Sequence, residues 1–191
     1  MATQTFELVS PFMTIYAPSK KFDSASSSLL LGQTANRLVA GELLELVGNN
    51  GVQRPAHTIA AGAQTELTKF VAPYFSETGR GDIITSGNVP ILQFGPFEAD
   101  TMVFERNNEN YANTIGQGSL ANGYHTSFAI GAPVFAASVR NPLNGSTLAA
   151  DNYVIGISPN GTLGQDFVVG RVSRLIGSGA NAKVRVMFGI Q

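Results

Sequence analysis

The chain has 191 residues, of which 43% are hydrophobic and 13% are charged, and its formal net charge is −1. That length suffices for one domain or two small ones, and the near-neutral charge excludes electrostatic attraction to nucleic acid or to an anionic membrane. The sequence has no cysteine, which excludes disulfides, thiolate nucleophiles and cysteine-based zinc sites.

The low charged fraction also bears on the surface of the protein. Globular domains usually carry about 25% charged residues, so this surface must consist largely of uncharged polar residues and glycine. Such a surface suits contacts with other subunits better than it suits a highly soluble monomer.

Residues 1–28 are predicted to form an N-terminal arm. They lack the basic region and apolar core of a signal peptide, and the chain has no apolar run long enough to span a membrane, so we expect synthesis and assembly in a cytoplasm. Pro11 and Pro18 confine any strand within residues 6–16 to a sheet edge. The alternatives are an ordinary edge strand and an extended arm that orders against a partner.

Residues 29–191 are predicted to form a β-rich body, with a division into 29–123 and 124–191 as an alternative. The first strand signal lies in residues 37–47, followed by an Asn-Gly turn and a short return strand over residues 52–55. A helix competes there because Glu and Leu favour helices, but the internal glycine and the following turn favour the strand.

The middle of the chain mixes signals. Residues 59–76 are the most helix-like segment, with two turns predicted over 65–71 and a loop as the alternative. Residues 79–82 and 86–90 are predicted as loops, and strands are predicted over 91–94 and 98–105.

A long polar stretch, rich in Asn and Gly, covers residues 106–123. Loops of this length inside a compact domain tend to be mobile or functional. Residues 124–130 then lead into the C-terminal part of the chain.

Residues 131–190 predict a compact antiparallel unit of four or five short strands. Asn144-Gly145 and Asn160-Gly161 lie between β-rich runs, and Asn-Gly readily adopts the positive φ angles of a type I′ hairpin turn. Residues 177–181 predict a longer turn of the same kind.

Two of these runs alternate with a period of two, which predicts a sheet with one buried face. One face carries Tyr153, Ile155 and Ile157 against Val154, Gly156 and Ser158 on the other. In the last run Val184, Val186 and Phe188 oppose Lys183, Arg185 and Met187.

The two histidines, His57 and His125, are far apart in sequence and neither has a second ligand at metal-binding spacing. Neither has an evident serine or aspartate companion, and no Gly-x-Ser-x-Gly motif is present. We therefore interpret both as structural residues.

Three carboxylates, Glu98, Asp100 and Glu105, cluster around one predicted strand. Glu98 and Asp100 share a face, so a cation site or an acid/base pair is conceivable, but a calcium site needs more oxygen ligands than two. We favour a solvated strand face whose carboxylates pair with Arg37 or Arg106.

We do not interpret several other motifs as binding or catalytic sites. Residues 116–121 superficially match a dinucleotide fingerprint but lack the strand and helix that it requires. Arg80-Gly81-Asp82 is short enough to recur by chance, and the two sequons at Asn144 and Asn160 are interpreted as turns.

Basic residues concentrate in the last two predicted strands. Arg171 and Arg185 are predicted to form a small positive stripe, joined by Arg174 and Lys183. The stripe is too small for nucleic acid without aromatic partners, so we expect salt bridges at a protein interface.

The segments GELLEL and NNGVQRPA near Gly41, and GAPVFAA, NYVIGIS and AKVRVMF in the last third, resemble the head decoration (cement) proteins of tailed bacteriophages. In that family a Gly-x-x-Val strand opens a small barrel, a Val-Ile-Gly-Ile-type strand follows, and a Val-x-Val strand closes it. The corresponding positions here are Gly131 to Phe135, Val154 to Ile157 and Val184 to Val186. Residues 59–123 match no part of the family pattern.

The resemblance implies a mostly β protein with a small antiparallel β-barrel or β-tulip-like body, an extended N-terminal arm and long loops. It also implies a homotrimer on the outer capsid surface of the virion, with the major capsid protein as partner. We expect no enzymatic activity, cofactor, metal, nucleic-acid or membrane binding. The alternatives are a tail-tube or other minor virion subunit and a carbohydrate-binding β module, although the chain has no Trp to stack on sugars.

Overall fold

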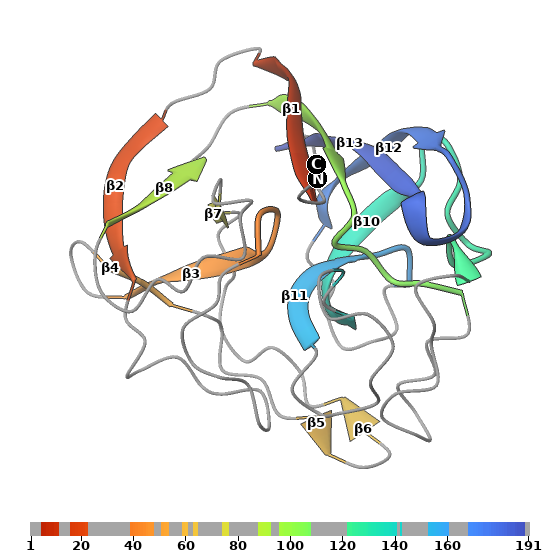
Figure 1. Ribbon diagram of the computed structural model, residues 1–191, viewed down its shortest axis with the longest axis horizontal. Coiled ribbons are helices and arrows are strands. Elements are labelled where there is room, and N and C mark those ends of the chain that lie inside the picture. The colour runs from red at the N-terminus through yellow and green to blue at the C-terminus, as the bar shows by residue number, and fades with distance from the viewer. Residues whose placement is uncertain are drawn as a thin grey trace.

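The computed structural model describes residues 5–11, 16–22, 39–47, 51–53, 59–60, 63–64, 74–76, 88–92, 96–107, 122–140, 142, 153–160 and 168–189 (Figure 1). The described part is mostly β, which confirms the predicted class at that level. It contains no α-helix, only short 3₁₀ turns. None of its helices is long and apolar enough to cross a membrane.

The largest element is a six-stranded sheet in which every pair of neighbours is antiparallel. In spatial order its strands are β1 (Phe6–Pro11), β9 (Phe97–Thr101), β13 (Lys183–Phe188), β12 (Val168–Ile176), β10 (Pro133–Arg140) and β11 (Tyr153–Ser158). The last four of these form the predicted C-terminal unit. Two strands from earlier in the chain, β1 and β9, extend it.

Of the three turns predicted in residues 131–190, one is confirmed, one is wrong and one lies outside the described residues. Residues 177–182 join β12 to β13 as an antiparallel hairpin with a 3₁₀ turn at Gly179–Asn181, as predicted. The Asn160-Gly161 hairpin is wrong, because β10 lies between β11 and β12 and pairs with both. The Asn144-Gly145 turn lies outside the described residues.

β1 is an edge strand whose only described partner is β9. Pro11 ends it and the register shifts between Leu8 and Ser10, two features that discourage further strand pairing. Pro11 thus lies on an edge strand, as predicted.

A second group of short strands pairs in a cycle from β2 through β4, β3, β7 and β8 back to β2 (Figure 1). Its strands are β2 (Tyr16–Phe22), β3 (Leu43–Val47), β4 (Gly51–Gln53), β7 (Tyr74–Ser76) and β8 (Asn88–Leu92). The β3–β4 pairing confirms the predicted hairpin after residue 47. Pro18 does not confine β2 to an edge; it lies where the register with β8 shifts, between Ala17 and Lys20.

The segment predicted to be most helix-like begins and ends in strands. β5 (Ile59–Ala60) pairs with β6 (Ala63–Gln64), and β7 follows at Tyr74. The loop predicted over 86–90 is wrong in part, because β8 begins at Asn88. The predicted helix over 65–71 lies outside the described residues, as do Arg80-Gly81-Asp82 and residues 116–121.

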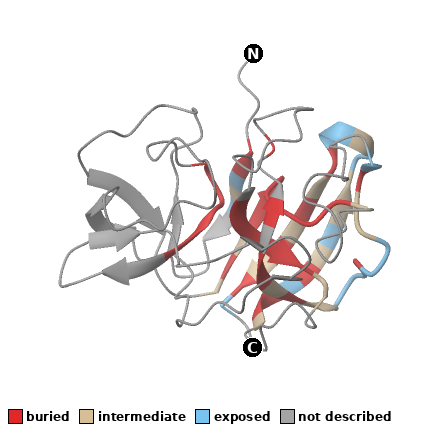
Figure 2. Ribbon diagram, turned by 90° about the horizontal axis from the view of Figure 1, so that it is seen from below, coloured by how far each residue is buried: buried red, intermediate tan, exposed pale blue. Residues whose placement is uncertain are grey.

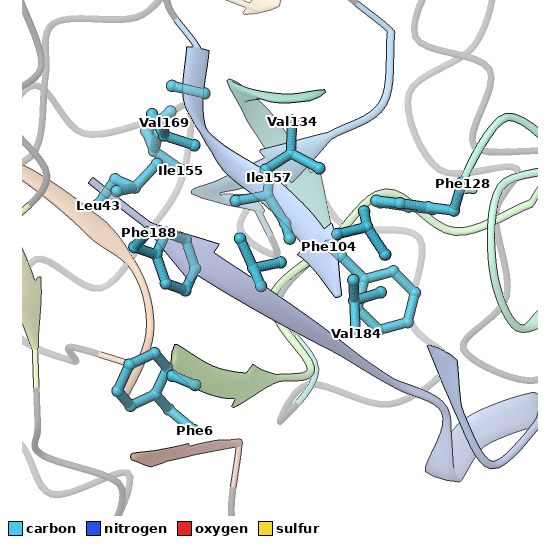
Figure 3. Packing of buried hydrophobic residues seen from close by; sticks show 14 of the residues in the cluster. Phe6, Leu43, Phe104, Phe128, Val134, Ile155, Ile157, Val169, Val184 and Phe188 are labelled. Atoms are coloured by element: carbon cyan, nitrogen blue, oxygen red, sulfur yellow. The ribbon is translucent and has the colours of Figure 1, made fainter. Parts of the chain in front are cut away.

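One hydrophobic core lies against the six-stranded sheet and draws on all six of its strands, with Leu43 of β3 added (Figure 3). On β13 the alternation is as predicted: Val184, Val186 and Phe188 are buried and the residues between them are half-buried. Phe97 and Phe188 pack together with ring centroids 5.1 Å apart. The period of two on this strand therefore does mark one core-facing side.

β11 departs from that expectation, because Val154 to Ser158 are all buried (Figure 2). Ile155 and Ile157 belong to the main core, whereas Val154 packs in a second, smaller cluster with Val39, Val103 and Val139. The prediction of one buried face is wrong for this strand, since a second layer of chain covers its other side.

The continuation of β9 lies along the edge of β11 that faces away from β10. The Ile157 N–H donates to the Val103 carbonyl (3.1 Å) and the Glu105 N–H donates to the Ile157 carbonyl (2.9 Å), which makes a parallel bridge centred on Phe104. Gly156 permits this approach, because a Cβ there would lie 2.4 Å from the Val103 carbonyl oxygen.

Gly156→Ala should therefore lower the free energy of unfolding by about 3 kcal/mol, because the backbone of Val103 must move to admit the methyl group. Urea denaturation measures this loss. The matched control is Gly131→Ala, where a Cβ has nothing within 4 Å but φ is +83°. The control should cost about 1 kcal/mol, for backbone strain alone. Equal losses in the two variants would contradict the close packing at Gly156.

Candidate functional site

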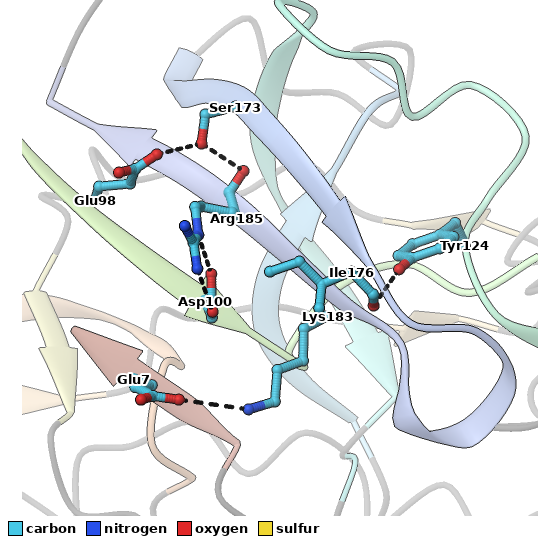
Figure 4. A network of polar contacts seen from close by, with 8 residues as sticks. All are labelled: Glu7, Glu98, Asp100, Tyr124, Ser173, Ile176, Lys183 and Arg185. Atoms are coloured by element: carbon cyan, nitrogen blue, oxygen red, sulfur yellow. Dashed lines mark hydrogen bonds and ion pairs between the residues drawn. The ribbon is translucent and has the colours of Figure 1, made fainter. Parts of the chain in front are cut away.

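The outer face of the six-stranded sheet carries a row of charged side chains in register across β1, β9 and β13 (Figure 4). Arg185 donates from Nε and Nη2 to the two carboxylate oxygens of Asp100, at 2.6 and 3.0 Å. This hydrogen bond raises the pKa of Arg185 above its ordinary value, and Coulombic attraction to Asp100 adds to the effect. The pair is a two-pronged ion pair of the kind that Arg and carboxylates favour.

Two further contacts extend the row. Lys183 Nζ lies 3.6 Å from a carboxylate oxygen of Glu7. Ser173 Oγ donates to Glu98, whose side chain is half-buried. These contacts link β1 to β13 and β9 to β12 across the strand between them.

These contacts correct the predicted partners. Asp100 pairs with Arg185, a partner that the sequence did not suggest, and Arg37 lies outside the described residues. Arg185 and Lys183 therefore form salt bridges within the chain, where the sequence predicted an intermolecular interface. Arg171 donates to the Gly131 carbonyl, and Arg174 is exposed.

The Asp100–Arg185 pair should show a coupling energy of about 1–3 kcal/mol in a double-mutant cycle of Asp100→Asn and Arg185→Gln. The exposed side-chain fractions are 9% and 24%, so water screens the pair little. Glu7 and Lys183 are 51% and 25% exposed and have poorer geometry. Their cycle, with Glu7→Gln and Lys183→Gln, should give less than about 0.5 kcal/mol. Similar couplings in both cycles would refute this ranking.

Glu105 does not join Glu98 and Asp100, although the sequence places it on the same strand. β9 ends at Thr101, and the chain then turns. The Met102 N–H donates to the Thr5 carbonyl and the Val103 N–H donates to Thr101 Oγ1. Glu105 thus reaches β11, on the far side of the sheet order from Asp100.

The Glu105 side chain is buried, with the residue only 2% exposed. Ser158 Oγ donates to Glu105 Oε2 and accepts a hydrogen bond from the Asn160 N–H at 2.9 Å. Burial raises the pKa of Glu105 to about 7, against the opposing effect of the Ser158 hydrogen bond. This is the strongest electrostatic perturbation of a carboxyl group in the described residues, and sequence reasoning missed Ser158 as its partner.

The next residue, Arg106, connects this segment to the β12–β13 hairpin. Its Nη1 donates to the Gly179 carbonyl at 3.0 Å, and its guanidinium carbon lies 4.1 Å from the centre of the Phe104 ring. Tyr124 pairs with Arg106 in an antiparallel bridge, and its hydroxyl donates to the Ile176 carbonyl. The hairpin is therefore held from two sides.

The same bridge closes the base of the predicted long loop. The Asn107 N–H donates to the Gly123 carbonyl (3.2 Å), and Asn122 Nδ2 donates to the Asn107 carbonyl (3.0 Å). The two ends of the stretch 106–123 are thus joined to each other, while residues 108–121 lie outside the described part.

His125 follows this bridge and is half-buried. Its N–H donates to the Glu105 carbonyl at 3.3 Å, and its Nδ1 accepts from the Ser127 N–H at 3.2 Å. Burial lowers the pKa of His125 below its usual value of 6.5. The ring is therefore neutral at pH 7 and accepts a hydrogen bond within its own turn, which agrees with a structural role.

His125 should make the protein less stable as the pH falls. A lowered pKa means that the unfolded chain binds the proton more tightly, so the stabilising effect is present above pH 6.5 and is lost on acidification. Between pH 7.5 and 5.5 the free energy of unfolding of the wild type should fall by less than about 1 kcal/mol relative to that of His125→Gln. Urea denaturation at both pH values measures the difference. A relative gain on acidification would show that this sign is wrong.

Together these groups form two polar assemblies, the outer-face row and the buried Glu105–Ser158 pair, and both hold strands together. Among the described residues, no group of three or more His, Asp or Glu side chains lies suitably placed for a metal ion. His57 lies outside the described residues, so its distance from His125 is not defined by them.

Comparison with protein-family models, with curated proteins and with solved structures finds no match to this chain. The site is therefore interpreted from its own residues.

Proposed function

We propose that this chain is a virion structural protein, a decoration protein that binds the outside of an assembled phage head and clamps neighbouring major capsid subunits. The observation that carries the proposal is the arrangement of the segments that resemble such proteins. The strands of Gly131 to Phe135, Val154 to Ile157 and Val184 to Val186 belong to one sheet. Val134, Ile155, Ile157, Val184 and Val186 from these strands share one core.

The described surface supports this role. Asp100 pairs with Arg185 and Glu7 with Lys183 on one sheet face, so these four charges offset one another there. Val9 and Ile130 are exposed large apolar side chains. A protein that clamps subunits needs a wide contact surface of low charge.

The proposal includes a small β-barrel or β-tulip-like body and assembly as a homotrimer. The cyclic pairing of β2, β4, β3, β7 and β8 supports a barrel in one part of the body. The bridge between Phe104 and Ile157 supports curvature in the six-stranded sheet, because it brings the continuation of β9 to the outer side of β11.

The proposal is tested by the solution mass of the purified chain and by its uptake onto capsid shells that lack it. A decoration protein binds the assembled shell and not the free subunits, so it stabilises the shell by mass action. We expect a discrete trimer, or a monomer that shells take up, and a higher melting temperature of the loaded shells. Shells that already carry the protein are the control and should take up none.

Three results would contradict this role. A stable monomer that shells ignore would favour a carbohydrate-binding β module, which glycan binding would then test. Open-ended self-polymerisation without shells would favour a tail-tube subunit. Uptake onto shells with no change in their melting temperature would favour a minor virion subunit without a clamping role.

A further inference from the structure

The continuation of β9 covers the outer edge of β11 over three residues, Val103 to Glu105. Two backbone hydrogen bonds make this contact, and Gly156 lets the chains approach. The carboxyl group of Glu105 lies at the end of the covered stretch, where Ser158 Oγ on β11 donates to it. The seam between the two segments thus contains one buried ionisable group with one hydroxyl donor.

We propose that the buried Glu105 carboxyl is a proton-controlled latch, which holds Val103–Glu105 over the edge of β11 and releases it when the carboxyl ionises. The hydrogen bond from Ser158 opposes this release, because it stabilises the carboxylate. Release would leave the outer edge of β11 unpaired, and an unpaired strand edge is a template for strand addition. The latch is a property of the isolated chain and goes beyond the proposed function, on which it does not depend.

The surroundings of Glu105 favour this behaviour. β11 contributes no ionisable side chain within Val154–Ser158. The opposite segment contributes His125, whose backbone N–H donates to the Glu105 carbonyl. The adjacent Arg106 directs Nη1 to the Gly179 carbonyl and lies over the Phe104 ring. A carboxylate formed at this place is therefore held by Ser158, and burial disfavours its charge.

Proton linkage gives the direction in which the stability of the closed latch changes with pH. Burial raises the pKa of Glu105 from 4.5 to about 7 in the closed latch. An opened segment exposes the carboxyl group to water, so the open state releases the proton at lower pH than the closed state. The closed latch is most stable below pH 4.5 and weakens progressively up to about pH 7.

Hydrogen exchange of the full-length chain at the Glu105 and Ile157 amides, which make the two seam hydrogen bonds, tests the latch. After correction for intrinsic exchange, the opening constant should rise roughly 50-fold from pH 5 to pH 8 and level off at the top of that range. The rise should be absent in Glu105→Gln. In Ser158→Ala the midpoint should move to higher pH, because the lost hydrogen bond stabilises the charged form.

Two control variants separate the latch from general electrostatics. Glu98→Gln removes a second described carboxylate that accepts from a serine hydroxyl, and His125→Gln removes the histidine whose N–H donates to the Glu105 carbonyl. Both should keep the rise. A flat profile in the wild type, a rise that persists in Glu105→Gln, or a rise that disappears in Glu98→Gln or His125→Gln would overturn the proposal. So would a Ser158→Ala midpoint at lower pH.

A reference amide distinguishes local release from unfolding. The Val172 N–H donates to the Ala132 carbonyl in the body of the sheet at 3.0 Å. At pH 8 Ile157 should open at least about tenfold more often than Val172. Equal opening would mean that the whole fold opens together, which would overturn the latch. If a variant fails to fold, the ¹³C chemical shift of the wild-type Glu105 carboxyl serves instead. A midpoint near 7 would support the proposal, and one near 4.5 would overturn it.

Discussion

The pairing of Val103–Glu105 with Ile157 is the contact on which the arrangement of the described body depends. It gives the edge of β11 that faces away from β10 a backbone partner, and it brings Val103 to the cluster with Val39 and Val139 that buries Val154 on the second face of β11. It also places Glu105 against Ser158, and Arg106 where it reaches the β12–β13 hairpin. The contact exists because Gly156 has no side chain to oppose the Val103 carbonyl.

The two serine–glutamate pairs show how location determines the behaviour of one chemical motif. Ser173 donates to Glu98 on the outer sheet face, and Ser158 donates to Glu105 at the seam. Glu98 is half-buried on a face that also carries Arg185, whereas Glu105 is almost completely buried. Burial, against the effect of its hydrogen bond, raises the pKa of Glu105 to about 7. A serine hydroxyl thus helps to hold two strands together at one place and donates to a titratable buried carboxyl at the other.

The proposed role and the latch make different demands on the same fold. A clamp on a capsid needs a rigid body, which the core beneath β13, β12 and β10 supplies. A latch needs a segment that can open separately from the rest. Val103–Glu105 meets β11 through two backbone hydrogen bonds and the Glu105–Ser158 pair, and its Val103 and Phe104 side chains are buried in the two apolar clusters. Both are compatible in one chain because local stability varies across a fold.

The sequence by itself determined the β class, the alternation of β13, and the hairpins β3–β4 and β12–β13. Each depends on neighbours along the chain: a period of two, or glycine in a short polar turn. Strand order, the partner of Asp100 and the second covered face of β11 were decided only by the tertiary structure. Asp100 and Arg185 form a pair although they are 85 positions apart in the sequence. Ser158 and Glu105 are 53 positions apart. Local periodicity shows that a strand has an apolar face, but what covers the other face depends on which distant segments meet it.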